Sequence, residues 1–115
     1  MPMPRITWNN RALTAPLRRA ERMGISETAQ AGKAAAQRNI VEKNIVDTGH
    51  MLNTVEADEA REIGHRVEAR FGNWQAGYAL YHELGTYKMN ARPWLMPALE
   101  EVRGDIPTRI RRHMP

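Results

Sequence analysis

The tripeptide Asp47-Thr48-Gly49, which follows the apolar pair Ile45-Val46, is the strongest catalytic candidate in this sequence. Asp-Thr-Gly is the catalytic turn of aspartic proteases, in which two facing carboxylates share a proton and activate water. Such an enzyme needs strands before the tripeptide, whereas this chain has an alanine-rich stretch with helical spacing. It also lacks a downstream apolar pair followed by Gly-Arg to brace the catalytic loop. A turn after a helix is the better interpretation, and a protease is a remote alternative.

The other residue types that perform chemistry do not form catalytic or ligand-binding patterns. The only serine, Ser26, has no Gly-x-Ser-x-Gly around it, and the glycines form no phosphate-binding loop. With no cysteine, thiolate metal sites and cysteine nucleophiles are excluded. The four histidines, none of which pairs with another at metal-ligand spacing, are His50, His65, His82 and His113. We therefore expect no enzymatic activity, no metal and no cofactor.

The length and composition of the chain predict one small folded domain. A chain of 115 residues and 13.1 kDa buries about two thirds of its surface, which suffices for one modest core. Hydrophobic residues make up 42% and charged residues 26%, so wholesale disorder is not expected. No apolar run approaches the ~18 residues of a membrane span, and residues 1–10 lack the apolar stretch of a signal peptide. We expect a single cytoplasmic domain, residues 1–115, with no membrane partner.

The net charge of +4 is concentrated at the two ends of the chain. Residues 1–22 carry a local charge of +4 and residues 106–115 one of +3, while residues 23–105 carry −3. Arginine-rich termini can bind phosphates or an acidic partner surface, although a solvated charged face is an equally good interpretation. The C-terminal candidates for partner contacts are Arg109, Arg111 and Arg112.

The first part of the chain is expected to be mostly helical. Residues 1–10 hold two prolines and no periodicity, which favours an N-terminal arm. Apolar and small residues then recur at spacings of three and four, which predicts a helical region over residues 11–45. Gly24 either breaks this helix or merely weakens it. Because its stripe consists mostly of small residues such as Ala29 and Ala36, the helix should pack closely against a neighbour but contribute little apolar area by itself.

The middle of the chain predicts a β-hairpin over residues 50–72. Apolar and polar residues alternate over residues 51–58 and, most clearly, over residues 63–71. The acidic segment 58–62 would join these two antiparallel strands.

The last third of the chain combines aromatic residues with helix signals. Residues 78–85 are expected to form a short aromatic-rich helix, followed by a loop. Pro93 suits the first position of a C-terminal helix over residues 93–104. Gly104 and Pro107 would kink or end it, leaving a basic tail over residues 105–115. The sequence thus predicts an α+β fold with a long N-terminal helix, a small antiparallel sheet and a C-terminal helix.

A small DNA-binding protein is the main functional alternative, because aromatic side chains among basic ones stack on bases. The aromatic-rich segment 71–94 contains only Lys88 and Arg92 as cations, however, and Glu83 opposes them. Aromatic side chains that supply the core of a small domain explain the segment better.

Two adjacent blocks of this sequence resemble a family of small tailed-phage proteins. The first block reads Tyr78-Ala79-Leu80-Tyr81-His82-Glu83-Leu84-Gly85-Thr86, and the second reads Ala91-Arg92-Pro93-Trp94-Leu95-Met96-Pro97-Ala98-Leu99-Glu100. They are similar to the head–tail joining proteins, which are also called neck, tail-completion or tail-component proteins. Asp47-Thr48-Gly49-x-x-Leu52 resembles a further segment of that family. Leu84 and Trp94 replace the usual Phe, which conserves an apolar anchor.

The motif residues are expected to be scaffold rather than an active site. Tyr78, Tyr81 and Leu84 would face the sheet from one short helical turn, and Gly85 would let the chain reverse. Glu83 would pair with Arg92 across the loop. The remaining motif positions are Thr86, Pro93, Trp94, Leu95, Pro97, Ala98 and Leu99.

The resemblance implies a ring, commonly sixfold, in the virion between capsid and tail, assembled in the host cytoplasm with genomic DNA passing through its lumen. A closed ring needs two different surfaces on each subunit. The candidates are the alanine-rich helix and the loop that contains Tyr87, Lys88 and Met89. Neighbouring connector, tail-terminator or tail-tube proteins would be the partners, and the terminal arginines would face either DNA or such a neighbour. Whether the ring is a neck, tail-completion or tail-terminator ring stays open.

Overall fold

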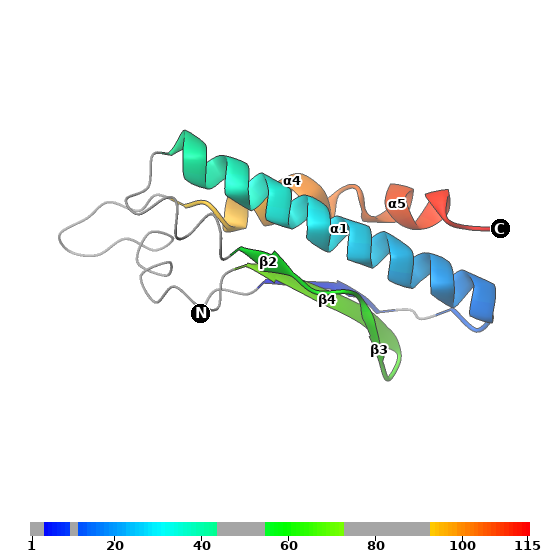
Figure 1. The fold of residues 1–115 in the computed structure, drawn as a ribbon. Coiled ribbons are helices and arrows are strands. Elements are labelled where there is room, and N and C mark those ends of the chain that lie inside the picture. The colour runs from blue at the N-terminus through cyan, green and yellow to red at the C-terminus, as the bar shows by residue number, and fades with distance from the viewer. Residues whose placement is uncertain (1–3, 10–11, 44–54, 73–92) are drawn as a thin grey trace.

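The computed structural model of the protein describes residues 4–9, 12–43, 55–72 and 93–115. It has the predicted α+β fold, with a long N-terminal helix, a small antiparallel sheet and two short C-terminal helices. The helix α1 lies over the sheet, and α4 and α5 lie beside α1 in the same helical layer (Figure 1). No described helix is both long and apolar enough to span a bilayer.

Helix α1 spans Ala15–Glu42 and runs without interruption through Gly24. Of the two alternatives that the sequence left open at Gly24, the break is absent, because burial against another helix outweighs the ~1 kcal/mol helix penalty of glycine. Ala29 and Ala36 are both fully buried inside the single chain. They belong to its core and are not available to a neighbouring subunit, which corrects the expectation from the small-residue stripe.

Strand β4, Arg66–Gly72, forms the centre of the sheet. Strand β1, Arg5–Trp8, pairs with it on one side, whereas β2, Glu56–Ala57, and β3, Arg61–Ile63, pair with it on the other. Both β1 and β3 pair with the same part of β4, so they occupy opposite sides of that strand. All pairings are antiparallel.

Two parts of the sheet differ from the sequence prediction. The segment expected to be an N-terminal arm contains strand β1, in which Ile6 is only 2% exposed. The sequence did not predict this strand, because four residues are too few to show periodicity. The expected strand over residues 63–71 is divided by a turn at Gly64, which has a φ of 59°. Part of the expected acidic linker is therefore strand β3. The hairpin turn lies after Ile63 rather than within the linker.

The C-terminal region contains two helices, α4 over Met96–Arg103 and α5 over Ile106–Arg112. Pro97 and Pro107 stand near the starts of these helices, where a missing N–H costs no hydrogen bond. The C-terminal helix thus begins after Pro93 rather than at it. The expected basic tail is largely a helix, because burial of Ile110 against α1 orders a segment with little apolar periodicity of its own.

The core lies between the helical layer and the sheet. Its largest fully buried side chains are Trp94, Phe71, Ile6, Ile25 and Ile40, so every described layer contributes to it. The small residues of α1 allow these larger side chains to fit. The ring of Phe71, for example, rests against Gly32.

Candidate functional site

Of the two family-like blocks, only residues 93–100 are described, and most of their apolar members pack in or against the core. Trp94, Leu95 and Ala98 are at most 1% exposed, whereas Pro93, Pro97 and Leu99 are half-buried. The following motif and contact candidates lie outside the described residues: Asp47, Thr48, Gly49, Leu52, Tyr78, Tyr81, Glu83, Leu84, Gly85, Thr86, Tyr87, Lys88, Met89 and Arg92. Their roles, including the Glu83–Arg92 pair, stay predictions.

Two polar contacts, one from this block and one just after it, also join the C-terminal region to α1. The Nδ2 of Asn39 donates a hydrogen bond of 3.1 Å to the carbonyl oxygen of Trp94. Nearby, Arg38 donates to the carboxylate of Glu101, and this bond together with the charge attraction raises the pKa of Arg38. The described part of the motif therefore has a structural role, the attachment of the C-terminal helix.

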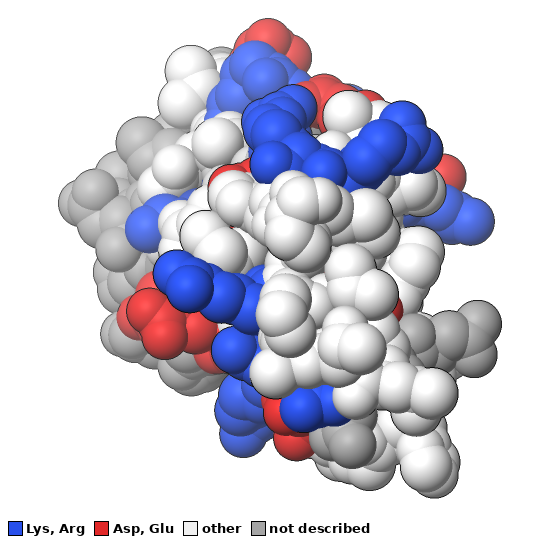
Figure 2. All heavy atoms as spheres, turned by 90° about the vertical axis from the view of Figure 1, so that its right-hand side faces the viewer, with Lys and Arg blue, Asp and Glu red and all other residues white. Residues whose placement is uncertain are grey.

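The basic start of α1 and the basic end of α5, which are far apart in sequence, lie together at one end of the molecule. Helix α5 runs antiparallel to α1, so that its C-terminus lies beside the start of α1 (Figure 1). We call this region the basic end and define it by six arginines. They are Arg18, Arg19 and Arg22 of α1 and Arg109, Arg111 and Arg112 of α5. Figure 2 views the molecule from this side and shows blue side chains around a largely white central surface.

The arginines of the basic end differ in their partners. Arg22 donates to Glu62 of β3 at 2.9 Å, and the Nε of Arg18 lies 3.7 Å from the same carboxylate. By contrast, Arg19, Arg111 and Arg112 are exposed and form no ion pair with a described residue. Three cations thus remain available to a partner.

An open groove of about 640 Å³ lies between the start of α1 and the end of α5. Its lining combines apolar and cationic groups: Ala15, Pro16, Met23 and Pro115 with Arg19, Arg22 and His113. An adjoining hollow of about 340 Å³ shares Arg22 and Met23 with it. Two further apolar side chains of this region are exposed, Leu13 at 95% and Met114 at 47%. Protein interfaces are enriched in arginine and methionine and depleted of lysine relative to the rest of the surface, and this region has the same bias.

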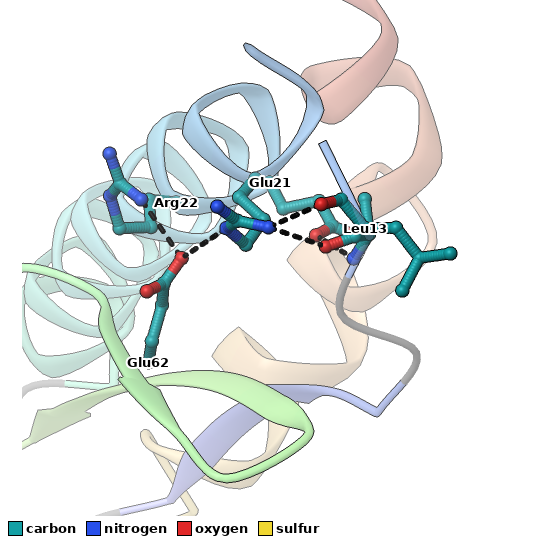
Figure 3. A network of polar contacts seen from close by, with 6 residues as sticks. Leu13, Glu21, Arg22 and Glu62 are labelled. Carbon is teal, nitrogen blue, oxygen red and sulfur yellow. Dashed lines mark hydrogen bonds and ion pairs between the residues drawn. The ribbon is translucent and has the colours of Figure 1, made fainter. Parts of the chain in front are cut away.

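A polar network holds the backbone beneath Leu13 (Figure 3). Arg18 donates to the carbonyl oxygens of Leu13 at 2.6 Å and of Ala12 at 3.4 Å. The buried carboxylate of Glu21 accepts a bond of 2.8 Å from the N–H of Ala12. The side chain of Leu13 points away from this network. An apolar side chain is therefore presented to solvent from a fixed backbone.

Two more contacts fasten the groove to the rest of the fold. The Nε2 of His113 is hydrogen-bonded to the carboxylate of Glu27, which joins the end of α5 to α1. The hydroxyl of Ser26 accepts a 2.8 Å bond from the N–H of Ala60, which joins α1 to the segment before β3. The only serine of the sequence therefore has a structural role.

Sequence reasoning found the charge of the basic end but missed its shape. The charge imbalance of the termini was visible, whereas the contributions of Leu13 and Met23 required knowing that α5 lies beside α1. Within the described ranges, no three acidic or histidine side chains are arranged to hold a metal ion. Comparisons with protein-family models, with curated proteins and with solved structures find no match for this chain.

Proposed function

We propose that the protein is a structural component of a tailed-phage particle, forming a ring at the head–tail junction that joins capsid to tail and lets DNA pass. One observation carries the proposal, the order and density of family-like residues in two adjacent blocks, 78–86 and 91–100, behind a long helix. The packing of Trp94, Leu95 and Ala98 supports a scaffold role for the second block, since these residues attach α4 to the core.

The described sheet supplies a means of ring closure. Strands β1 and β3 lie on opposite sides of β4, and neither pairs with another described strand on its outer side. Two different edges on one subunit allow the head-to-tail contacts that a ring requires. The basic end is a further surface, located away from the core contacts of α4, and it is free to contact a neighbouring component.

Electron microscopy of lysates from a parent phage with this gene inactivated tests the proposal. We expect filled heads beside detached tails, and restoration of joined particles when the gene is supplied in trans. Joined, intact particles without the gene would contradict a joining role.

The DNA-binding alternative is favoured by one observation, the three exposed arginines of the basic end, Arg19, Arg111 and Arg112, which pair with no described carboxylate. It requires an affinity for duplex DNA that falls steeply with salt and prefers one sequence. The protease alternative rests on a tripeptide outside the described residues. Peptide cleavage that is lost in Asp47→Asn would support it.

A further inference from the structure

We propose that the basic end is a docking surface for a segment of another protein that carries apolar side chains flanked by acidic ones. Leu13 and the groove beside Met23 would receive the apolar side chains, and the three available arginines would pair with the acids. The identity of this partner as the adjoining component of the phage particle rests on the proposed function, whereas the surface itself is defined by the described residues.

Leu13 is the clearest anchor. It is the most exposed of the large apolar side chains that the structure describes, at 95%, and its carbonyl is held by Arg18 at 2.6 Å. A side chain on a restrained backbone loses less entropy on binding than one on a mobile loop. Burial of a leucine stabilises a complex by about 1.5–3 kcal/mol, which is enough for a binding hot spot.

The groove at the start of α1 supplies further apolar side chains and has cations in its lining. The groove adds Met23, Pro16 and Pro115, and Arg19 stands on its rim. An apolar centre with a polar rim is the general anatomy of a protein interface. The charge of this rim is positive and partly unpaired among the described residues, so the matching partner is acidic.

The partner is not a second copy of the described surface, because the described part of the chain has no acidic patch to offer. Most described carboxylates already have partners: Glu27 bonds to His113, Asp58 pairs with Arg70, and Glu62 pairs with Arg18 and Arg22. The same holds for Glu68 with Arg66, Glu100 with Arg103 and Glu101 with Arg38. Asp105, Glu59 and Glu42 are also exposed, but they lie on separate segments: between α4 and α5, before β3 and at the end of α1.

Duplex DNA also fits this surface less well than a protein does. Phosphates would satisfy Arg19, Arg111 and Arg112 but would leave Leu13 and Met23 facing a charged backbone. DNA binding would therefore depend on the arginines alone, whereas protein docking depends on the arginines and on Leu13.

Binding of synthetic probes to the full chain, followed by fluorescence anisotropy, tests this difference. The probes are a short amphipathic peptide of Glu and Leu, the same peptide with Ala in place of Leu, and a mixed-sequence duplex DNA. We expect the Glu/Leu peptide to bind more tightly than the other two. Leu13→Asp and Arg19→Glu should each weaken it by about tenfold, as expected for loss of a hot-spot contact.

Matched controls separate docking from general charge and from folding. Val41→Asp changes an apolar side chain that is 56% exposed at the other end of α1, and Arg103→Glu reverses a charge on α4. Both should leave the peptide affinity within about twofold of the parent. Because all four altered side chains are exposed, the melting temperatures should stay close to the parent value.

Three outcomes would overturn the proposal. Tighter binding of DNA than of the Glu/Leu peptide, with no effect of Leu13→Asp, would identify a phosphate site. Self-association that Leu13→Asp abolishes would identify a second copy as the occupant. Equal affinities for the Glu/Leu peptide and its alanine version would show that apolar side chains do not contribute to binding. None of these outcomes bears on the gene-inactivation experiment, so the joining role and the docking surface can fail separately.

Discussion

Gly24 of α1 lies directly against the backbone of Ile110 in α5. A Cβ at Gly24 would stand 2.6 Å from the Cγ1 of Ile110 and 2.7 Å from its Cα and N. The two helices can approach this closely only because Gly24 has no side chain. This contact places the C-terminal arginines beside those of α1, and the basic end depends on it.

Gly24→Ala is therefore expected to displace α5, although alanine is the better helix former. Overpacking against backbone atoms costs about 1–3 kcal/mol, and the melting temperature should fall by several degrees. Thermal unfolding followed by circular dichroism measures this. Gly104→Ala is the matched control, because a Cβ at Gly104 would meet nothing within 4 Å and the φ of this residue is −68°. Equal melting temperatures for the two variants would refute the close contact.

A similar contact between Gly32 and Phe71 holds α1 against β4. A Cβ at Gly32 would lie 2.6–2.8 Å from three atoms of the Phe71 ring. Gly32→Ala should destabilise the fold by about 1–3 kcal/mol through this clash. Phe71→Leu in the same chain should remove part of the clash, so the double variant should be more stable than the sum of the two single effects. Purely additive free energies of unfolding in denaturant titrations would count against this contact.

The hydrogen bond from Asn39 to the Trp94 carbonyl should contribute measurably to stability. Asn39 is 9% exposed, and Trp94 is fully buried, so Asn39→Ala leaves a carbonyl without this donor in the core. We expect a loss of about 1–3 kcal/mol in urea unfolding. Arg38→Gln removes the neighbouring exposed ion pair and should change stability much less. If Arg38→Gln were the more damaging variant, the attachment of α4 would depend on charge instead.

Ser26 offers a test of how the sheet is tied to α1. Ser26→Ala removes the acceptor for the Ala60 N–H and should cost about 0.5–1.5 kcal/mol. Hydrogen exchange at the Ala60 amide should accelerate at the same time. Thr28→Val is a suitable control, because the Thr28 hydroxyl donates to the carbonyl of Gly24 within the same helix rather than to another element. An unchanged Ala60 exchange rate in Ser26→Ala would show that this bond does not protect the segment.

The elements with strong local signals were predictable, and those stabilised by neighbours were not. Helix α1 and strand β4 repeat their apolar residues over many positions, so their periods can be read directly. Strands β1 and β3 have only four and three residues, and the seven residues of helix α5 make about two turns. These lengths are too short for a strand or helix period to be recognised. They are ordered by pairing with β4 or by packing on α1, both of which involve residues distant in sequence.

The sequence by itself determined the α+β class, the scaffold role expected of Trp94 and the excess of arginine at both termini. Only the tertiary structure decided that the start of α1 lies beside the end of α5, and that Met23 lines a groove with Arg19 and Arg22. The reason is physical. Charge and periodicity are properties of a local stretch of chain, whereas the close packing of α5 on the start of α1 depends on the fit between Gly24 and Ile110, two residues on different helices.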